Sequence, residues 1–277
     1  MAAAPFDRET LLGEARFERE ALGRTVQYAN PARWDDPSPC EGWRNRDVLA
    51  HLASDEGIAS ALLAKEATPE FDEFVNGGGS IEDDTYNNWA VDRRRELPFR
   101  EIAMEWGRAA DKFMVHAAKV SEEEWRSRTV HWFGDDWTIA DFVQSEMAEW
   151  WSHGEDIRAG VDLAPRIEHW PIYAVNDLSI RILPQILAGT GRSYSGKSVK
   201  LALVAAGGAT WHQSLTPDVE PAETKPPDVV IDGNAHSFAM VAEQKVSADY
   251  FLDNGDIVIG GEEWIAFDIL ENLKPWL

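Results

Sequence analysis

The stretch WTIADFVQSEMAEWWSHGEDIRAG, residues 137–160, decides the fold of the first half of the chain. Thr138 followed by Asp141 resembles an acidic capping box, and Gly160 is a C-terminal stop signal, so one helix is predicted over residues 139–159. At about 100° per residue its apolar side chains fall on one face. Glu146, Glu149 and His153 fall on the same arc.

Charged side chains therefore occupy positions that helical periodicity assigns to the core. Burying an ionised carboxylate without a partner is costly, so these residues need a metal, hydrogen bonds or a cavity that contains water. A single metal ion would satisfy all of these side chains at once.

A second stretch, RDVLAHLASDEGIASALLAK at residues 46–65, repeats the anomaly by placing His51 and Asp55 on or beside an apolar face. Two imidazoles and a carboxylate can hold zinc or a similar divalent ion with a position left open for chemistry. We predict that His51, Glu149 and His153 are metal ligands. Asp55 is predicted to orient the His51 ring through its second nitrogen, with direct approach to the metal as the lesser alternative.

Each signal has an ordinary alternative. A lone histidine on an apolar face is more often a satisfied core residue, and Glu-x-x-x-His pairs without a metal are common on helices. The metal reading is favoured because both helices carry the same departure from binary patterning, which is expected at functional sites.

Composition restricts the class of protein. The chain has 277 residues, is 44% hydrophobic and 27% charged, and carries a formal net charge of −23, which disfavours nucleic-acid and membrane partners. Cys40 is the single cysteine, no secretory signal follows Met1, and no run of about 20 apolar residues predicts a membrane span, so we expect a cytoplasmic protein. The 13 tryptophans are typical of core and pocket walls. Trp150 is a candidate for cofactor binding because it lies close to His153.

The pattern of apolar and polar residues changes along the chain, which predicts a helical domain at residues 1–164 and an α+β domain at 165–277. The first is expected to be a bundle with helices at 7–28, 45–65, 85–119 with a break near Pro98, and 138–159, and with loops at 30–43, 75–84 and around 131–134. The second is expected to contain helices at 169–188, at 235–251 and at the end of the chain. Its strands, SVKLALVA, TWHQSL, DVVIDG and IVIGG, predict a small antiparallel or mixed sheet.

Two motifs resemble a known family. PCEGWRNRDVLAHLA (39–53) and EWWSHGEDIRAG (149–160) are similar to the two signatures of the mycothiol-dependent maleylpyruvate isomerases, a branch of the DinB-like metalloenzymes. GGATWHQ (207–213) and DVVIDGNAHSFAMV (228–241) look like the sterol-carrier-like second domain of that family.

The resemblance implies a DinB-like four-helix bundle followed by a smaller α/β domain, with metal ligands at His51, Glu149 and His153. It implies a mycothiol-dependent isomerase or S-transferase, in which a divalent ion lowers the pKa of the thiol and presents a thiolate to a small electrophile that can carry a carboxylate. Zinc is favoured by the donors, although nickel, iron or cobalt would accept them. The expected protein is a monomer or homodimer.

The C-terminal domain departs from the family at one place. Members often carry an arginine in a "GRR"-like stretch suited to a carboxylate, whereas this chain reads Ala242-Glu243-Gln244-Lys245. Lys245 is therefore a candidate for binding cofactor or substrate, with a solvated helix charge as the favoured alternative. Asn88 and Arg93, together with Asn87, are candidate substrate positioners.

Two further classes remain open at this point. One is a metal-braced binding or carrier protein, whose second domain holds a small apolar molecule or lipid without catalysis. The other is a degenerate member that binds no metal.

Overall fold

The computed structural model describes residues 6–80, 85–132, 135–219, 221 and 225–273. The predicted loops at 75–84 and 131–134 and the segment 216–228 fall partly outside these residues. Among the described helices, none combines the length and the apolar character needed to cross a membrane. The chain divides into two compact units, one ending at Arg166 and the other beginning at Ile167.

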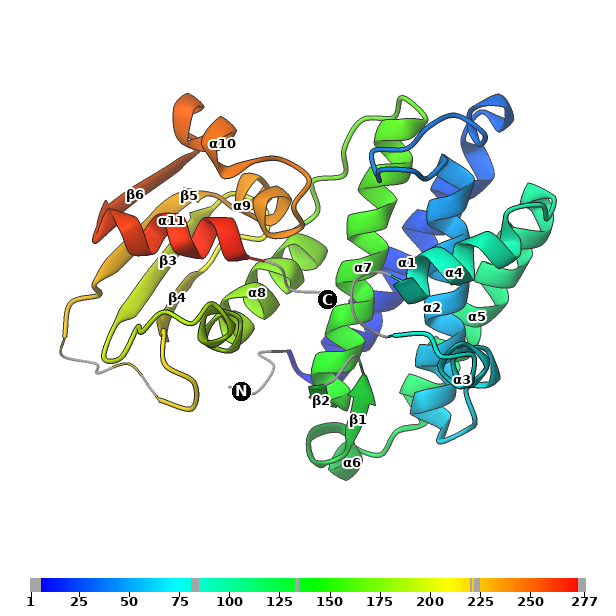
Figure 1. The fold of residues 1–277 in the computed structure, drawn as a ribbon, viewed down its shortest axis with the longest axis horizontal. Helices are drawn as coiled ribbons and strands as arrows, with labels where there is room; N and C mark the ends of the chain where they lie inside the picture. Colours follow the sequence, from blue (N-terminus) through cyan, green and yellow to red (C-terminus); the bar gives the residue numbers. More distant parts are fainter. Residues whose placement is uncertain (1–5, 81–84, 133–134, 220, 222–224, 274–277) are drawn as a thin grey trace. The chain divides into compact units, whose positions relative to one another are not determined.

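Four long helices form the N-terminal unit, so the predicted bundle is confirmed (Figure 1). These helices are α1 (Arg8–Tyr28), α2 (Asn45–Ala64), α5 (Phe99–Lys119) and α7 (Ile139–Gly160). Helices α1 and α2 each pack on both α5 and α7, which closes the bundle. Shorter elements connect them: η1 (Pro31–Arg33), α3 (Pro69–Asn76), α4 (Thr85–Arg94), α6 (Glu122–Ser127), β1 (Thr129–Trp132) and β2 (Asp135–Thr138).

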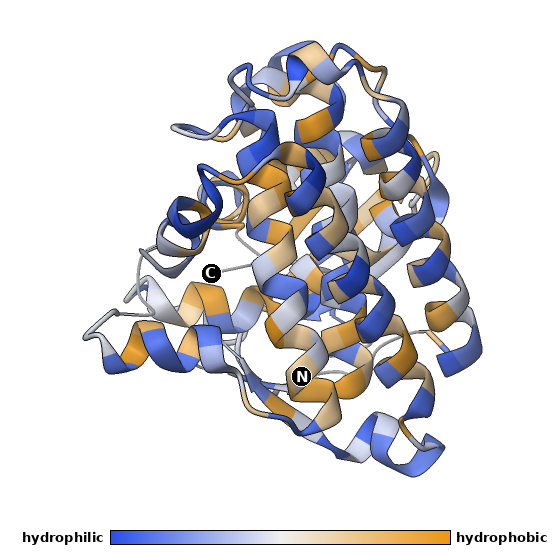
Figure 2. Cartoon of the chain, turned by 90° about the vertical axis from the view of Figure 1, so that its right-hand side faces the viewer, coloured by the Kyte–Doolittle hydropathy of each residue, from blue (hydrophilic) through white to orange (hydrophobic). Residues whose placement is uncertain are grey.

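The bundle core is rich in aromatic side chains, as the tryptophan content predicts. Phe113 of α5 makes edge contacts with Phe142 and Trp150 of α7, at centroid distances of 6.2 and 5.8 Å. Such contacts add to the free energy of burying the rings. Figure 2 shows hydrophilic and hydrophobic residues alternating along the helices of this unit.

Helix α7 begins and ends where its sequence predicts. The Thr138 hydroxyl oxygen accepts a hydrogen bond from the Asp141 N–H (3.2 Å) and the hydroxyl donates to the Asp141 carboxylate (2.6 Å), which caps the helix. At the other end, the Asn45 side-chain amide donates to the carbonyl of Gly160 (3.1 Å) and to that of Arg33 (2.9 Å). Gly160 is needed for this close approach, because an added Cβ would lie 1.7 Å from Asn45 Oδ1.

Several short elements of this unit differ from the prediction, and α6 and η1 are helical where none is predicted. Residues 129–132 and 135–138 pair as an antiparallel hairpin where a loop is predicted, with His131 opposite Asp136. Helix α3 occupies residues for which no helix is predicted; Pro69 at its first turn and an acidic first turn favour a helix start there.

The C-terminal unit is a four-stranded sheet with helices packed against it. Its strand order is β4-β3-β5-β6, with β3 parallel to β5 and the two outer strands antiparallel to their neighbours, so the sheet is mixed. The strands are β3 (Ser198–Val204), β4 (Thr210–Ser214), β5 (Val229–Asn234) and β6 (Ile257–Gly261). The helices are α8 (His169–Gly189), α9 (Ala235–Ala242), α10 (Ala248–Asn254) and α11 (Glu263–Asn272).

The predicted single helix over residues 235–251 is wrong, because a turn separates α9 from α10. Gln244 adopts a left-handed conformation (φ 53°), and the Lys245 N–H donates to the Met240 carbonyl (2.9 Å). This is the bonding of a helix C-terminus, so the chain leaves the helix axis there.

Gly160→Ala tests the packing between the end of α7 and the start of α2. The methyl group would displace Asn45 and break its bonds to two carbonyls, so we expect a loss of about 1–3 kcal/mol in the free energy of unfolding, measured by urea denaturation. Gly13→Ala is the control, because nothing lies within 4 Å of its added Cβ and alanine favours the helix by about 0.5–1 kcal/mol. Equal stability of the two variants would contradict this account.

Candidate metal centre

Helices α2 and α7 bring the three predicted ligands together. One donor atom each from His51, Glu149 and His153 lies within 4.8 Å of the other two. The two imidazole rings meet edge to face at a centroid distance of 4.8 Å, and His153 Nε2 lies 3.2 Å from Glu149 Oε2. The one-turn spacing of Glu149 and His153 places both on the face of α7 that packs toward α2.

These donors fit a divalent ion. Ligand atoms that share a zinc ion lie about 2.0–2.2 Å from the metal, so mutual separations below 4.8 Å need only small side-chain adjustments. His51 is 6% exposed, while the side chains of Glu149 and His153 are each 17% exposed. The group is therefore largely buried, and Glu149 and His153 keep a small part of their surface exposed to solvent.

The other ring nitrogen of His153 has its own partner. Nδ1 lies 3.0 Å from Asp156 Oδ2, to which the Cys40 thiol also donates a hydrogen bond (3.3 Å). In the neutral ring with its proton on Nδ1, Nε2 would carry the lone pair, and Nε2 lies 3.2 Å from Glu149 Oε2. Cys40, His153 and Asp156 also form a group whose donor atoms lie within 4.8 Å of one another, so His153 belongs to two possible metal-binding groups.

Asp156, rather than Asp55, holds a histidine of this group. Among the described residues no hydrogen bond joins Asp55 to His51, so the structure does not show the orienting role predicted for Asp55. The residue is nonetheless buried near the group: burial and the negative charge of Glu149 raise the pKa of its carboxyl to about 8.

The two histidines titrate in opposite directions. Burial, and then the positive charge of His153, lower the pKa of His51 to about 3. Burial also opposes the charged form of His153, but Glu149 and Asp156 outweigh it and raise the pKa of His153 well above its usual range. The surrounding carboxylates thus favour one cation here, a condition that a proton or a metal ion can satisfy.

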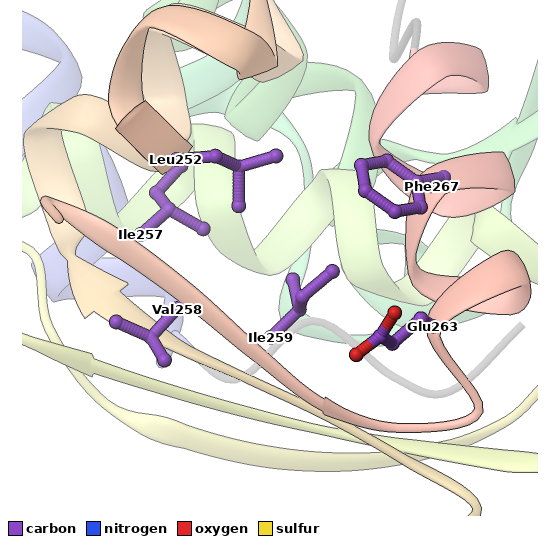
Figure 3. Close-up of a pocket in the computed structure, with 6 residues that line it drawn as sticks. All are labelled: Leu252, Ile257, Val258, Ile259, Glu263 and Phe267. Carbon is purple, nitrogen blue, oxygen red and sulfur yellow. The ribbon is translucent and has the colours of Figure 1, made fainter. Parts of the chain in front are cut away.

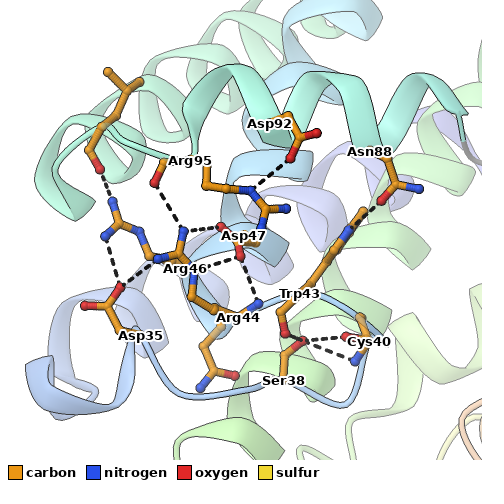
Figure 4. A network of polar contacts seen from close by, with 12 residues as sticks. Asp35, Ser38, Cys40, Trp43, Arg44, Arg46, Asp47, Asn88, Asp92 and Arg95 are labelled. Atoms are coloured by element: carbon orange, nitrogen blue, oxygen red, sulfur yellow. Dashed lines mark hydrogen bonds and ion pairs between the residues drawn. The ribbon is translucent and has the colours of Figure 1, made fainter.

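Trp43, in the loop before α2, packs beside His51 and was not among the predicted site residues. The Trp43 ring lies 5.4 Å from the His51 ring, and its indole N–H donates to Asn88 Oδ1 of α4 (2.9 Å) (Figure 4). Asn88, a predicted substrate positioner, therefore holds Trp43 beside the group. The packing of an indole on His51 depends on the path of a loop, so no periodic signal reveals it.

An ion-pair network fixes this loop to α2 (Figure 4). Arg44 donates to both carboxylate oxygens of the fully buried Asp47, through Nε (2.9 Å) and a terminal nitrogen (3.0 Å), and its backbone N–H donates to the same carboxylate. A bidentate arginine–carboxylate pair gives strong geometric definition. It sets where Cys40 and Trp43 lie relative to His51.

The remaining candidates lie elsewhere. Arg93 pairs with Glu73 of α3 (2.8 Å) and covers the Trp89 ring, so it packs on α3 and α4. Trp150 is fully buried and directs its indole N–H to Glu56, which is a core contact. Lys245 lies in the C-terminal unit, in the turn between α9 and α10. The binding roles predicted for Trp150 and Lys245 stay predictions.

Two further buried acidic residues, Glu56 and Glu146, lie on the same two helices as the candidate ligands. Glu56 accepts indole N–H bonds from Trp106 (3.0 Å) and Trp150, while Glu146 lies on the adjacent α7. Burial raises the pKa of both carboxyls well above the usual range, and Asp55 adds to the effect. Burial therefore favours the neutral form of both side chains.

Glu56→Gln tests the neutral state. Glutamine keeps an acceptor for the two indoles, so the free energy of unfolding at pH 7 should equal or exceed that of the unchanged chain, whereas Glu56→Ala should lose about 1–3 kcal/mol for each unsatisfied donor. Because the folded pKa lies above the unfolded one, Glu56 disfavours folding increasingly as pH rises above about 4.5. Glu56→Gln should remove that part of the pH dependence, and a glutamine variant as unstable as alanine would refute it.

Known proteins resemble this chain in sequence and in fold. Residues 15–158 match the family described as the mycothiol maleylpyruvate isomerase N-terminal domain. Two uncharacterized proteins of Mycobacterium tuberculosis, from strains CDC 1551 / Oshkosh and ATCC 25618 / H37Rv, are each 22% identical over 151 residues, which are 54% of this chain and 56% of the relative. The chain thus matches little more than half the length of these relatives.

Solved structures extend the likeness in fold to both units. The mycothiol-dependent maleylpyruvate isomerase (TM-score 0.61) and a mutant of it (0.60) are each 17% identical to this chain, covering 92% of it and 93% of the matched chain. The matched domain spans more than half of the sequence and contains all three predicted ligands. The chain therefore belongs to the mycothiol maleylpyruvate isomerase family.

Proposed function

We propose that this chain is a divalent-metal-dependent enzyme that uses a low-molecular-weight thiol, mycothiol, to act on a small electrophilic substrate. Zinc is the proposed ion and His51, Glu149 and His153 its ligands. The observation that carries the proposal is the convergence of these three donors within 4.8 Å on two packed helices. Family membership supports the thiol, since the isomerase of similar fold is mycothiol-dependent.

Each part of the group has a separate task in this proposal. A bound divalent ion would lower the pKa of a thiol and hold it as the thiolate. Asp156 holds the proton of His153 at Nδ1 and so keeps Nε2 available as a donor. Trp43 excludes water on the His51 side and offers an apolar surface to the substrate.

The isomerase and S-transferase reactions share their first step. In both, the thiolate sulfur would form a bond to a carbon of an activated double bond, and the electron pair of that double bond would move to the activating group. An isomerase then returns this pair after rotation about the former double bond and expels the same thiolate, whereas an S-transferase keeps the sulfur attached and the substrate takes up a proton. Lys245 is proposed to bind a carboxylate of the substrate or thiol as a point charge, which is less selective than an arginine fork.

Metal content tests the ligand set. Purified without chelator, the unchanged chain should contain about one divalent ion per chain by mass spectrometry of the elements, and His153→Ala should lose most of it because a donor is removed. His131→Ala is the control, because its ring is exposed and lies beside Asp136 in the hairpin, 3.1 Å from that carboxylate. Equal metal loss in both variants, or none in either, would contradict the assignment.

Addition of thiol to the cobalt-substituted chain separates catalysis from a carrier role. Direct sulfur ligation should produce a charge-transfer band, as three protein ligands leave a position open. A metal that stays bound with no spectral change on thiol addition would favour a carrier protein braced by the metal.

Asn88→Ala tests whether Trp43 positions the bound thiol. Loss of one hydrogen bond worth about 0.5–1.5 kcal/mol should weaken thiol binding about two- to tenfold while metal content stays constant, as measured by spectroscopic titration. Asn87→Ala is the matched control on the same helix. If both alanine variants bind the thiol like the unchanged chain, Trp43 needs no anchor at Asn88.

A further inference from the structure

The C-terminal unit carries an apolar groove of about 370 Å³ at one edge of its sheet. The edge strand β6 forms its floor and helices α10 and α11 form its sides (Figure 3). Its apolar lining consists of Leu252, Ile257, Val258, Ile259 and Phe267. The volume lies at the lower end of the range for small-molecule sites.

Large apolar side chains are left open to solvent at this edge. Val258 of β6 is 56% exposed and Phe267 of α11 is 39% exposed. Edge strands are usually protected by charged side chains or proline, but β6 reads Ile-Val-Ile-Gly-Gly. An apolar occupant would remove these surfaces from water.

One charged side chain lines the groove. Glu263 lies one turn before Phe267 on α11, and Figure 3 shows both on the same side of the groove, with the Glu263 carboxylate near Ile259. Among the described residues, its carboxylate makes no hydrogen bond or ion pair, whereas the neighbouring Glu262 is paired with Lys197. Within the part of the chain that the structure describes, the groove therefore presents one unpaired carboxylate beside an apolar surface.

Residues 246–273 contain seven acidic side chains and no lysine or arginine. Two of them are paired with basic residues from elsewhere in the unit, Glu262 with Lys197 and Asp268 with Arg192, so the charge at the groove itself is that of Glu263. The Glu263 carboxylate would repel a ligand with an anionic head, such as a fatty acid, and would attract a ligand with a cationic head.

We propose that this groove binds a small organic cation with an apolar tail. The tail packs against Leu252, Ile259 and Phe267, and the cationic head lies beside Glu263. This binding activity does not depend on the metal centre, because every residue that lines the groove belongs to the C-terminal unit.

A set of three eight-carbon probes tests the proposal on the full chain. Octylammonium, 1-octanol and octanoate share the tail and differ in head charge, and methyl NMR of labelled Leu, Ile and Val follows the groove directly. We expect octylammonium to shift the signals of Leu252, Val258 and Ile259 saturably, with octanol weaker and octanoate at least tenfold weaker.

Variants of residues on α11 separate the contribution of charge to binding from that of apolar contact. Glu263→Gln should weaken octylammonium binding about three- to fivefold, in line with an exposed ion pair, and Phe267→Ala about tenfold. Glu271→Gln removes the same charge from α11 outside the groove and should leave the affinity unchanged. The proposal is overturned if octylammonium and octanoate bind alike, if Glu263→Gln and Glu271→Gln have the same effect, or if no probe gives saturable shifts at the groove.

Discussion

The placement of Glu149 beside two imidazoles, in a group largely removed from water, is the constraint on which the candidate metal centre depends. A carboxylate taken out of water needs a cation, and His51 and His153 lie where they can share one with it. Glu149 and Asp156 raise the pKa of His153, whereas burial, and then the charge on His153, lower the pKa of His51, so the site favours one positive charge and disfavours a second. A divalent ion would meet the same demand with both imidazoles neutral.

Contacts around the group serve to hold these donors in place. Asp156 fixes the ring of His153, and the Arg44–Asp47 pair fixes the loop that carries Cys40 and Trp43. Asn45 ties the start of α2 to the end of α7 through the carbonyl of Gly160. The helices that contribute the donors are thus linked at a point away from the donors themselves, which limits changes in their separation.

Local signals explain which parts of this structure could be predicted from the sequence. The bounds of α7 follow from a hydroxyl that caps its own helix, and the convergence of Glu149 with His153 follows from helical spacing; the predicted fold class is confirmed. Asp156 lies three residues after His153 and could have been found by the same spacing. Trp43 could not, because its place beside His51 depends on a bond to Asn88, and the break at Gln244 depends on a left-handed turn that a residue without special preference adopts.

The most direct test of the account is X-ray absorption spectroscopy of the zinc-loaded chain without added thiol. The account predicts a first shell of nitrogen and oxygen only, at about 2.0–2.2 Å, with two imidazoles, one carboxylate and one ligand that the protein does not supply. A sulfur atom at about 2.3 Å would place Cys40 on the metal. That result would contradict an open catalytic position formed by His51, Glu149 and His153.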